Sequence, residues 1–359
     1  MRILKGILKI FFLLLLLLLV ASLAYLVYFM AGSRREEDEK TLDVAYCNDR
    51  ILPVGGEYSV LSWNAGFGAY GPDFSFFMEG GTSSRAESAE AIRNHMAGMI
   101  ETIQGLDPDF LLMQEIDTDA DRSWHVDESY LLIRALEGYS STFATNYNSP
   151  YVIYPFASPM GKAHSGIMTF SKYCMENSAR YSLPVEKGFS RYFDLDRCYT
   201  VSKVKTDAGN YLCVFNVHLS AYTRDGTVTN EQIRVLSEHI RREYDAGNYV
   251  ICGGDFNKNL IGSLSDLFGN QDKEAPIWTT DFPKDLLDDK ISLVAPFDEN
   301  DPLPSVRNAD KPYSSGENYL ALVDGFLVSS NVKVTRTEVV NTGFAYSDHN
   351  PVVMRFILQ

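Results

Sequence analysis

The apolar positions of the chain fall into two unlike patterns. Residues 10–31 are apolar almost without interruption, whereas short apolar runs alternate with segments of helical period from residue 57 onward. Apolar runs that alternate with helical segments are typical of an α/β domain. We therefore expect one α/β domain at residues 57–359, joined by a linker at residues 32–56 to a hydrophobic N-terminal helix.

Two segments of the predicted domain have the period of amphipathic helices. The first is expected to begin at Ser83 or Ser84 and to end at Gly105, and the second lies between Asn230 and Gly247. Each places its apolar side chains on one face: Ala89, Ile92, Met96, Met99 and Ile103 in the first, and Ile233, Leu236, Ile240 and Tyr244 in the second. We expect both helices to pack on a sheet.

The remaining apolar runs predict strands. They occupy residues 58–64, 109–115, 165–171, 199–206, 210–218, 249–255, 322–329, 332–340 and 351–358. The second of these strands is expected to break at Glu115. In the run that ends at Asp255, Gly253 and Gly254 predict a tight turn or a close approach of the backbone to a ligand.

The N-terminal run is long enough to cross a bilayer, which takes about 20 apolar residues. A cleaved signal peptide is the alternative, because Ser22 and Ala24 are small residues at a suitable spacing after a basic start. The run continues past them, which favours an uncleaved anchor. Basic residues at positions 2, 5 and 9 precede the run, so the positive-inside rule predicts a cytoplasmic tail at 1–9, one transmembrane helix at 10–31 and an extracellular domain.

The chain is acidic, with a net charge of −15, and contains no run of basic residues. Avid binding to a nucleic-acid backbone depends on clustered Lys and Arg side chains. The composition therefore argues against avid nucleic-acid binding, although it leaves turnover of nucleic acids open.

The five cysteines are odd in number and include no close pair of the metal-binding type: Cys47, Cys174, Cys198, Cys213 and Cys252. Cys213 and Cys252 lie in predicted strands, where a free thiol behaves as a small apolar group. We do not expect a disulfide framework. A cysteine nucleophile is the alternative, but neither strand shows an activating neighbour.

Polar residues recur at or near the ends of the predicted strands and just before the last one. They are Asn64, Glu115, His218, Asp255, Asn257, Asp324, Asp348 and His349. Taken singly, each has an ordinary explanation as a turn former, a solvated carboxylate or a buried histidine with a hydrogen-bond partner. Because strand ends along one edge of a sheet converge in space, the set as a whole predicts one site.

The segments that carry these residues read LSWN, LLMQEID, FNVHLSA, GGDFN, LVDGFLVS and SDHNPV. In this order and at these separations they resemble the endonuclease/exonuclease/phosphatase superfamily, the deoxyribonuclease-like phosphoesterases. The resemblance covers residues 57–359 and implies a four-layer α/β sandwich, in which two packed β-sheets are flanked by helices. It also implies cleavage of phosphoester bonds with a divalent metal ion.

The resemblance implies that Glu115 is the principal metal ligand, with Asn64 beside it and Asp348 nearby. Carboxylate and amide oxygens suit Mg²⁺ or Mn²⁺, and without a Cys/His cluster in the sequence we do not expect a structural zinc site. A bound ion would neutralise charge that develops on the phosphoryl group.

The resemblance implies a second group of residues that act on substrate and water. Asp255 and Asn257 would position or deprotonate the attacking water, His218 and His349 would hold the phosphate, and Asp324 would orient His349. Whether Asp255 or His349 is the general base stays open at this point, with a weak preference for Asp255.

Three loops near these segments bear on the substrate. The glycine- and aromatic-rich loop after Asn64 is expected either to pack its phenylalanines, Phe67, Phe74 and Phe77, on the body of the domain or to form a rim for a substrate ring or a lipid headgroup. Later loops offer the polar residues Arg122, Lys162 and His164, which we expect either to contact a second phosphate or to be solvated.

The sequence thus predicts a membrane-anchored, outward-facing hydrolase of phosphate esters whose helix has the lipid bilayer as its partner. The substrate is open among nucleic acids, nucleotides, lipids and phosphosugars. A surface nuclease, a lipid phosphodiesterase of the sphingomyelinase type and a non-catalytic binding ectodomain are the alternatives.

Overall fold

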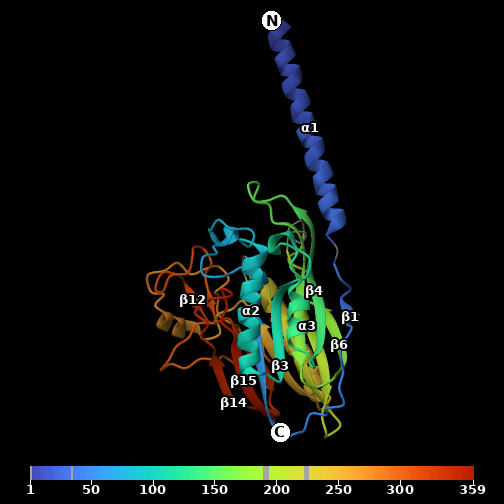
Figure 1. The fold of residues 1–359 in the computed structure, drawn as a ribbon, viewed down its shortest axis with the longest axis vertical. Coiled ribbons are helices and arrows are strands. Elements are labelled where there is room, and N and C mark those ends of the chain that lie inside the picture. Colours follow the sequence, from blue (N-terminus) through green and yellow to red (C-terminus); the bar gives the residue numbers. More distant parts are fainter. Residues whose placement is uncertain (1, 34, 189–193, 222–225) are drawn as a thin grey trace.

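The computed structural model describes residues 2–33, 35–188, 194–221 and 226–359. Figure 1 shows one long helix that projects from a body of strands and shorter helices. The helices are α1 Arg2–Gly32, α2 Ala89–Leu106, α3 Glu128–Ala135 and α4 Thr227–Asp245. Short 3-10 helices are η1 Gly66–Gly68, η2 Phe77–Glu79, η3 Asp121–Ser123, η5 Gly262–Phe268 and η6 Lys284–Leu286.

The strands form two large sheets and one small ribbon. The seven-stranded sheet has the order β1–β6–β7–β8–β9–β13–β10, and the six-stranded sheet has the order β14–β15–β2–β3–β5–β4. Bounds in the first sheet are β1 Glu39–Thr41, β6 Met175–Ser182, β7 Cys198–Lys205, β8 Tyr211–His218, β9 Tyr249–Asp255, β13 Asp324–Ser329 and β10 Ile291–Val294. Bounds in the second are β14 Val332–Val339, β15 Val352–Leu358, β2 Glu57–Asn64, β3 Phe110–Asp117, β5 Gly161–Ser171 and β4 Ser140–Val152. The ribbon pairs β11 Val306–Arg307 with β12 Leu320–Ala321.

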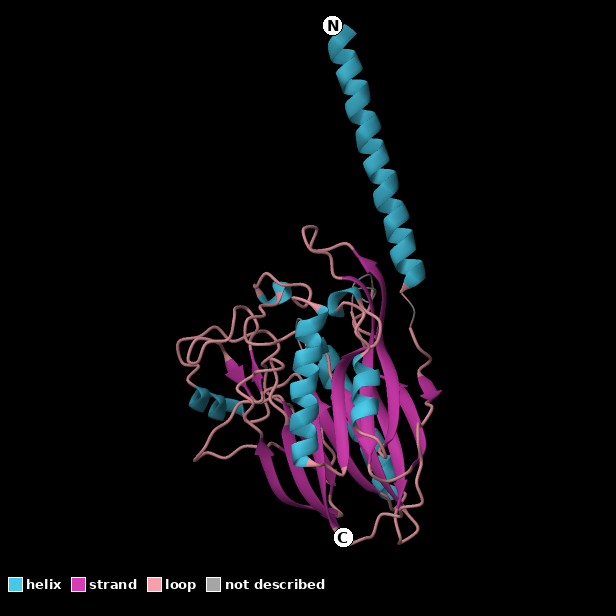
Figure 2. Cartoon of the chain, in the orientation of Figure 1, coloured by secondary structure: helices cyan, strands magenta, loops and turns pink. Residues whose placement is uncertain are grey.

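The two sheets pack face to face, and each is covered by a helix on its outer face. The layer between the sheets is apolar and buried, and includes Val60, Leu112, Val214, Ile251 and Met354. The apolar face of α2 lies on β2 and β3, and that of α4 lies on β8 and β9. Figure 2 shows the helices over the strands. The prediction of a four-layer α/β sandwich is therefore confirmed.

Helix α2 begins later than its sequence pattern predicts. Its N-cap is Ser88, whose hydroxyl accepts a hydrogen bond from the amide of Ala91, so the predicted start at Ser83 or Ser84 is wrong. Ser83 instead bridges to Phe76 in the preceding loop. Several serines precede the apolar face, and the pattern alone does not show which of them caps the helix.

Strand β3 continues past Glu115 to Asp117, which corrects the predicted break. Its register against β5 shifts between Met113 and Ile116, and Glu115 has a φ of 54°. A bulge of this kind adds one residue to a strand and turns a side chain out of the regular alternation. The strand therefore keeps its pairing while it presents Glu115 at the sheet edge.

The glycine pair before Asp255 serves the packing of the sheets and lies within β9 rather than in a turn. A Cβ on Gly253 would lie 2.7 Å from Leu112 of the facing sheet. Gly254 has a φ of 152°, and a Cβ there would lie 1.9 Å from the carbonyl oxygen of Val217 on β8. Both glycines let β9 approach its neighbours closely, which fixes the position of Asp255 at the strand end.

The segment expected as a linker, residues 32–56, runs along the domain and adds β1 to the edge of the seven-stranded sheet. Cys47 in this segment forms a disulfide with Cys174 in the connection from β5 to β6, a pairing that the sequence did not indicate. The two partners are far apart in sequence, which is why their spacing gave no signal. The predicted burial of Cys213 and Cys252 is confirmed, and burial raises the pKa of both thiols, which argues against a cysteine nucleophile.

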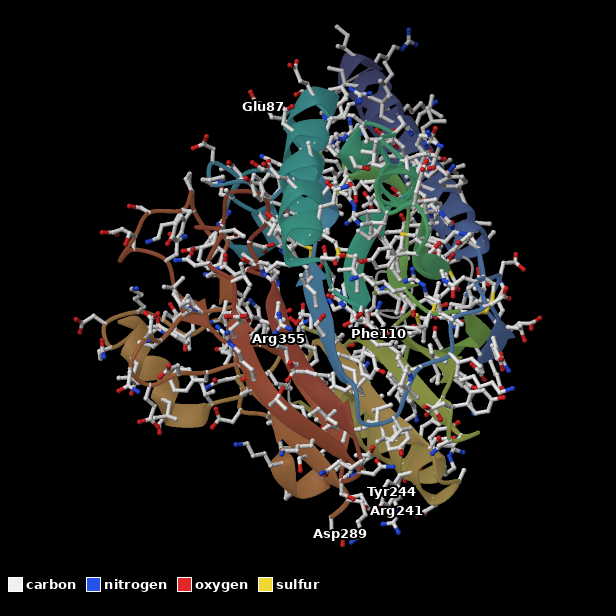
Figure 3. All side chains as sticks on the ribbon, turned by 60° about the horizontal axis from the view of Figure 1, so that its bottom comes forward. Glu87, Phe110, Arg241, Tyr244, Asp289 and Arg355 are labelled. Carbon is white, nitrogen blue, oxygen red and sulfur yellow. A yellow bond between two sulfur atoms is a disulfide. The ribbon has the colours of Figure 1, made fainter. Side chains whose placement is uncertain are left out.

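The carboxyl end of α4 is tied to the loop before β10. Arg241 lies 2.8 Å from Asp288 and 3.4 Å from Asp289, and Figure 3 shows Arg241, Tyr244 and Asp289 together at one end of the molecule. The predicted end of this helix near Gly247 is confirmed.

Helix α1 is long and apolar enough to cross a membrane, with a mean hydropathy of 3.0 in its most apolar window. None of that window is buried inside the protein. The helix meets the body near its carboxyl end, where Phe29 is buried.

Candidate active site

Three neighbouring strands of the seven-stranded sheet end at ionisable side chains. His218 closes β8, Asp255 closes β9 and Asp324 opens β13. In the register of the sheet Asp255 lies opposite both His218 and Asp324. The side chains are therefore in one row, and His218 Nε2 is 3.5 Å from Asp255 Oδ2.

Asn64 joins this row to the other sheet. Its Nδ2 donates to Asp255 Oδ2 at 3.0 Å and to Glu115 Oε1 at 3.1 Å. The Asn64 Oδ1 accepts from the amide of Gly66, which holds the side chain in place. His218 Nε2 is 3.8 Å from Glu115 Oε1, so the ends of β2, β3, β8 and β9 meet at one point.

Asp324 fixes the ring of His349. Its Oδ2 lies 2.8 Å from His349 Nδ1 and also accepts from Ser305 Oγ at 2.7 Å. The other ring nitrogen, His349 Nε2, is 3.8 Å from Asp255 Oδ2. A carboxylate on one nitrogen sets the tautomer and the orientation of an imidazole, so the other nitrogen is directed at the centre of the site.

The loop that carries Asp348 and His349 is bound to the end of β2. Ser347 Oγ donates to the carbonyl of Asn64 at 2.8 Å, and Trp63 Nε1 donates to the carbonyl of His349 at 2.9 Å. These contacts span almost the whole sequence of the domain. They explain why SDHN lies beside LSWN although the two segments are far apart along the chain.

Asn257 supports Asp255 from the loop that follows β9. Its amide N–H donates to Asp255 Oδ1 at 2.8 Å, and its side-chain Nδ2 donates to the carbonyl of Leu219 at 2.9 Å. Asn257 has a φ of 48°, a left-handed conformation that asparagine adopts more readily than most residues. The backbone therefore folds over Asp255 and fixes the direction of its carboxylate.

A cavity of about 570 Å³ opens above these side chains. Its lining includes Glu115, His218, Asp255, Asn257, Asp348 and His349. Asn64 and Asp324 lie behind this surface and contact the residues that form it. All eight predicted metal-binding and catalytic residues are thus brought together at one cavity.

The ionisable side chains in the cavity floor have shifted pKa values. Burial raises the pKa of Asp255 to about 7, with Asp324 adding to the rise and His349 opposing it. Burial also raises the pKa of Asp348 to about 6. Burial and the nearby charges of Arg197 and His349 lower the pKa of His218. Burial would also lower the pKa of His349, but the adjacent carboxylate of Asp324 raises it well above its ordinary value. These shifts favour the neutral form of His218 and the protonated form of His349.

The donor set fits a hard divalent cation. Glu115, Asp255 and Asp348 supply carboxylate oxygens at the cavity surface, the donors that Mg²⁺ and Mn²⁺ prefer. Donor atoms of Asp255, Asp324 and His349 lie within 4.8 Å of one another, but Asp324 and His349 already bond to each other. Glu115 and Asp348 are therefore the better candidates for ligands. Asn64 would have to turn its amide oxygen, which now accepts from Gly66, toward the ion.

The three loop residues proposed for substrate contact have different positions. Arg122 lines the cavity, but its Nε and Nη2 are bonded to both oxygens of buried Asp117. Lys162 is outside the cavity lining and pairs with Asp119 at 2.9 Å. His164 is likewise outside it, and its ring contacts Thr118 and Thr145.

The aromatic loop after Asn64 packs on the body of the domain, as one of its two expected roles required, and also reaches the cavity. Phe67 and Phe74 are buried in the core under α2, whereas Phe67 and Phe77 also line the cavity wall. Arg122 lies over the ring of Phe67, 3.9 Å from its centroid.

Two buried arginines of the cavity wall were not anticipated from the sequence. Arg197 and Arg307 both line the cavity, and within the described part of the chain Nε and Nη1 of each have no hydrogen-bond partner. Burial lowers the pKa of Arg307. Arg197 precedes β7 and Arg307 closes β11, where no recognisable motif marks them. Unsatisfied guanidinium N–H groups inside a cavity suit an anionic ligand.

A sequence profile of the Endonuclease/Exonuclease/phosphatase family matches residues 61–349. The chain belongs to this family. It is therefore a hydrolase of phosphoester bonds. No protein with a curated description matches the chain in sequence.

Solved structures of the family share the fold at low sequence identity. An endonuclease/exonuclease/phosphatase from Beutenbergia cavernae DSM 12333 is 17% identical, with a TM-score of 0.54 over 84% of this chain and 72% of that one. ANGEL2, a 2',3'-cyclic phosphatase in complex with adenosine-2',3'-vanadate, is 15% identical, with a TM-score of 0.57 over 88% and 98%. The human Nocturnin catalytic domain with a bound sulfate anion is 17% identical, with a TM-score of 0.51 over 89% and 97%.

Proposed function

We propose that the chain is a membrane-anchored, outward-facing, divalent-metal-dependent enzyme that hydrolyses a phosphodiester or a phosphomonoester by attack of water. The observation that carries the proposal is the meeting of Glu115, Asp255 and His349 with their hydrogen-bond partners at the floor of one cavity. A site that holds acidic, neutral imidazole and imidazolium groups together can bind a phosphate and move a proton.

Asp255 would take the proton of the attacking water. Its carboxylate is directed by the amide of Asn257 and by Asn64, and burial gives it a pKa near the range in which a general base works best. The oxygen of the water forms a bond to phosphorus, the bond from phosphorus to the ester oxygen breaks, and the leaving alcohol takes up a proton.

His349 and two arginines of the cavity wall would hold the phosphoryl group. The ring of His349, kept in place by Asp324, donates through Nε2, and Nε and Nη1 of Arg197 and Arg307 have no hydrogen-bond partner among the described residues. Arg197 Nε lies 3.9 Å from Asp194 Oδ1, and Arg307 Nη2 donates to the carbonyl of Gly71 at 2.9 Å. Burial lowers the pKa of His218, which favours its neutral form. Mg²⁺ or Mn²⁺ held by Glu115 and Asp348 would supply further neutralisation of the phosphoryl charge.

Two observations support the anchor and its orientation. Helix α1 has the length and hydropathy of a membrane span, and basic residues precede its apolar run. The disulfide between Cys47 and Cys174 is typical of proteins folded outside the reducing cytoplasm. Both favour a domain that lies outside the cell.

The test is a substrate panel assayed on the full chain in detergent with Mg²⁺, with Mn²⁺ and with a chelator. The panel contains nucleic acids, nucleotides, phospholipids, phosphosugars and a soluble chromogenic phosphodiester. We expect turnover of at least one phosphoester that the chelator abolishes. Absence of turnover across the panel would favour a non-catalytic domain, and activity confined to DNA or RNA with a steep salt dependence would favour a surface nuclease.

A further inference from the structure

The cavity has a polar floor and an apolar upper wall. The floor consists of the carboxylates, histidines and arginines described above, whereas the upper wall is aromatic and aliphatic. Side chains of the upper wall come from α1, from the loop around η2 and from the loop after β4: Tyr25, Phe29, Phe76, Phe77, Met78, Ile153, Tyr154 and Met160. A ligand with a phosphate at one end and apolar groups at the other would match both kinds of lining.

One part of the apolar wall belongs to the hydrophobic N-terminal helix itself. Tyr25 Oη donates to the carbonyl of Tyr151 at 3.1 Å and accepts from the amide of Ile153 at 3.3 Å. The amide of Tyr151 donates to Tyr28 Oη at 3.2 Å, and Phe29 is only 2% exposed. The carboxyl end of α1 is thus fixed against the end of β4, beside the mouth of the cavity.

The position of this contact along α1 places the mouth at the height of the bilayer surface. A span of the hydrocarbon core takes about 20 helical residues. Counted from the first residue after Lys9, about 20 residues end at Phe29. Tyr25 and Tyr28 are therefore in the last turns of the span, where tyrosine is enriched at membrane interfaces.

Exposed apolar side chains surround the mouth on the same side. Phe156 is 78% exposed, Tyr154 is 56% exposed and Met78 is 54% exposed. Figure 1 shows the loop after β4, which carries two of these residues, rising from the body on the side where α1 leaves it. Large apolar side chains in such a group mark a contact with another apolar phase, and the bilayer that holds α1 is the one adjacent to them.

We infer that the substrate is a phosphate-ester lipid of the membrane in which α1 is embedded, and that it enters the cavity from the plane of that membrane. This inference rests on the proposed function and specifies its substrate class. The acyl chains stay against the loop after β4 and the end of α1, while the headgroup phosphate reaches Asp255, His349 and Arg307. The oxygen of water bonds to phosphorus, the phosphorus–oxygen ester bond breaks, and the released alcohol takes up the proton.

The experiment compares three presentations of the phosphoester to the full chain reconstituted in liposomes with Mg²⁺. The first is a lipid in the same bilayer, the second is the same lipid in separate vesicles, and the third is a soluble dihexanoyl analogue of the same headgroup. Phosphatidylcholine, phosphatidylethanolamine, phosphatidylglycerol, phosphatidylinositol, phosphatidic acid and sphingomyelin are each supplied. We expect at least one to be hydrolysed roughly ten times faster or more in the same bilayer than in either other form.

Phe156→Asp tests the route from the membrane, since Phe156 is outside the cavity lining and its ring packs against the edge of Tyr154. It should lower turnover of the lipid in the same bilayer by roughly tenfold, because a charge in the apolar part of a bilayer is unfavourable. Turnover of the soluble analogue should not change. The matched control is Leu267→Asp on η5, which is 51% exposed and outside the cavity lining.

Two results would overturn the inference while leaving the proposed function intact. One is hydrolysis of soluble phosphoesters with no lipid hydrolysed in the same bilayer. The other is an equal rate on lipids in the same and in separate vesicles, with Phe156→Asp indistinguishable from Leu267→Asp. Failure of the proposed function looks different, because then no phosphoester in any form is turned over with Mg²⁺.

Discussion

The carboxylate of Asp255 contacts three other residues of the site. Its Oδ2 accepts from Asn64 at 3.0 Å and lies 3.5 Å from His218 Nε2, and its Oδ1 accepts from the amide of Asn257. The two carboxylate oxygens are thus held by both sheets and by the following loop. A carboxylate held this rigidly is positioned in advance for one geometry of attack.

The first prediction follows from this position. Asp255→Asn keeps the size of the side chain but removes the proton acceptor, so kcat should fall by roughly 10²-fold or more. KM should change much less, because the phosphate is held by other groups. Steady-state kinetics on the substrate found by the panel make the measurement, with exposed Asp266→Asn as the control. A loss confined to KM would assign Asp255 to binding instead.

The sequence alone indicated most residues of the candidate site, but not the arginines that the fold brings to it. Motif order was sufficient to select Asn64, Glu115, Asp348 and His349, because each stands in a recognisable segment at or near a strand end. Arg307 could not be found in this way. It comes from a two-stranded ribbon whose position depends on the fold, where the bond from Arg307 N to the carbonyl of Asp348 brings it to the site.

At the scale of elements, apolar periodicity predicted α2, α4 and most of the longer strands, and missed the short elements α3 and β10 and the long strand β4. Strand β4 buries Ser140, Thr142 and Asn146, so it lacks an apolar run in the sequence although it is one of the longest strands. Helix α2 begins after Ser88 because the Ser88 hydroxyl accepts a hydrogen bond from the amide of Ala91. Several serines precede the helix, and the sequence does not show which of them makes this bond. Polar partners such as these are known only after the chain is folded.

Helix α4 supplies a prediction on stability and pH. Glu243 accepts from Lys203 on β7 and from Asn248 before β9, at 2.9 and 2.7 Å. Burial alone would raise its pKa, but hydrogen bonds from His239, Lys203 and Asn248 lower it well below the ordinary value of 4.5. A carboxyl group whose pKa is depressed by folding stabilises the protein above its unfolded pKa and loses this effect as the pH falls.

Glu243→Gln should therefore be less stable than the wild type at neutral pH, and the difference should shrink as the pH falls below 4.5. Urea unfolding at several pH values makes the measurement. Glu238→Gln, at an exposed position of the same helix, is the control and should show no such dependence. A constant difference between Glu243→Gln and the wild type at every pH would mean that packing, not charge, accounts for the contribution.

At the scale of the whole molecule, the disulfide fastens the segment after α1 to the catalytic domain. Cys47 and Cys174 are separated by 127 residues in the sequence. Loss of a native disulfide commonly costs about 2–5 kcal/mol of unfolding free energy. We expect the Cys47→Ser, Cys174→Ser double variant to unfold at lower urea concentration than the wild type. Dithiothreitol should lower the stability of the wild type and leave the double variant unchanged, and equal stability of both proteins without reductant would show that the bond contributes nothing.

The relation between anchor and site also belongs to this scale. The long apolar run predicted a span from its length, but nothing in the sequence indicated that its carboxyl end forms part of the cavity wall. That position depends on the hydrogen bonds of Tyr25 and Tyr28 to the end of β4, which join residues more than a hundred positions apart.

The proposed hydrolysis depends on a divalent cation at Glu115. A Mg²⁺ titration of Glu115→Gln is the most direct test of this requirement. Both the wild type and the variant are assayed for phosphoester hydrolysis after chelation and stepwise return of Mg²⁺, with Glu101→Gln on the exposed face of α2 as the control. We predict no activity before Mg²⁺ is returned, and a half-saturating Mg²⁺ concentration at least about tenfold higher in Glu115→Gln, because the ion loses a charged ligand. Activity that survives chelation, or the same Mg²⁺ dependence in the wild type and Glu115→Gln, would contradict a catalytic divalent cation held by Glu115.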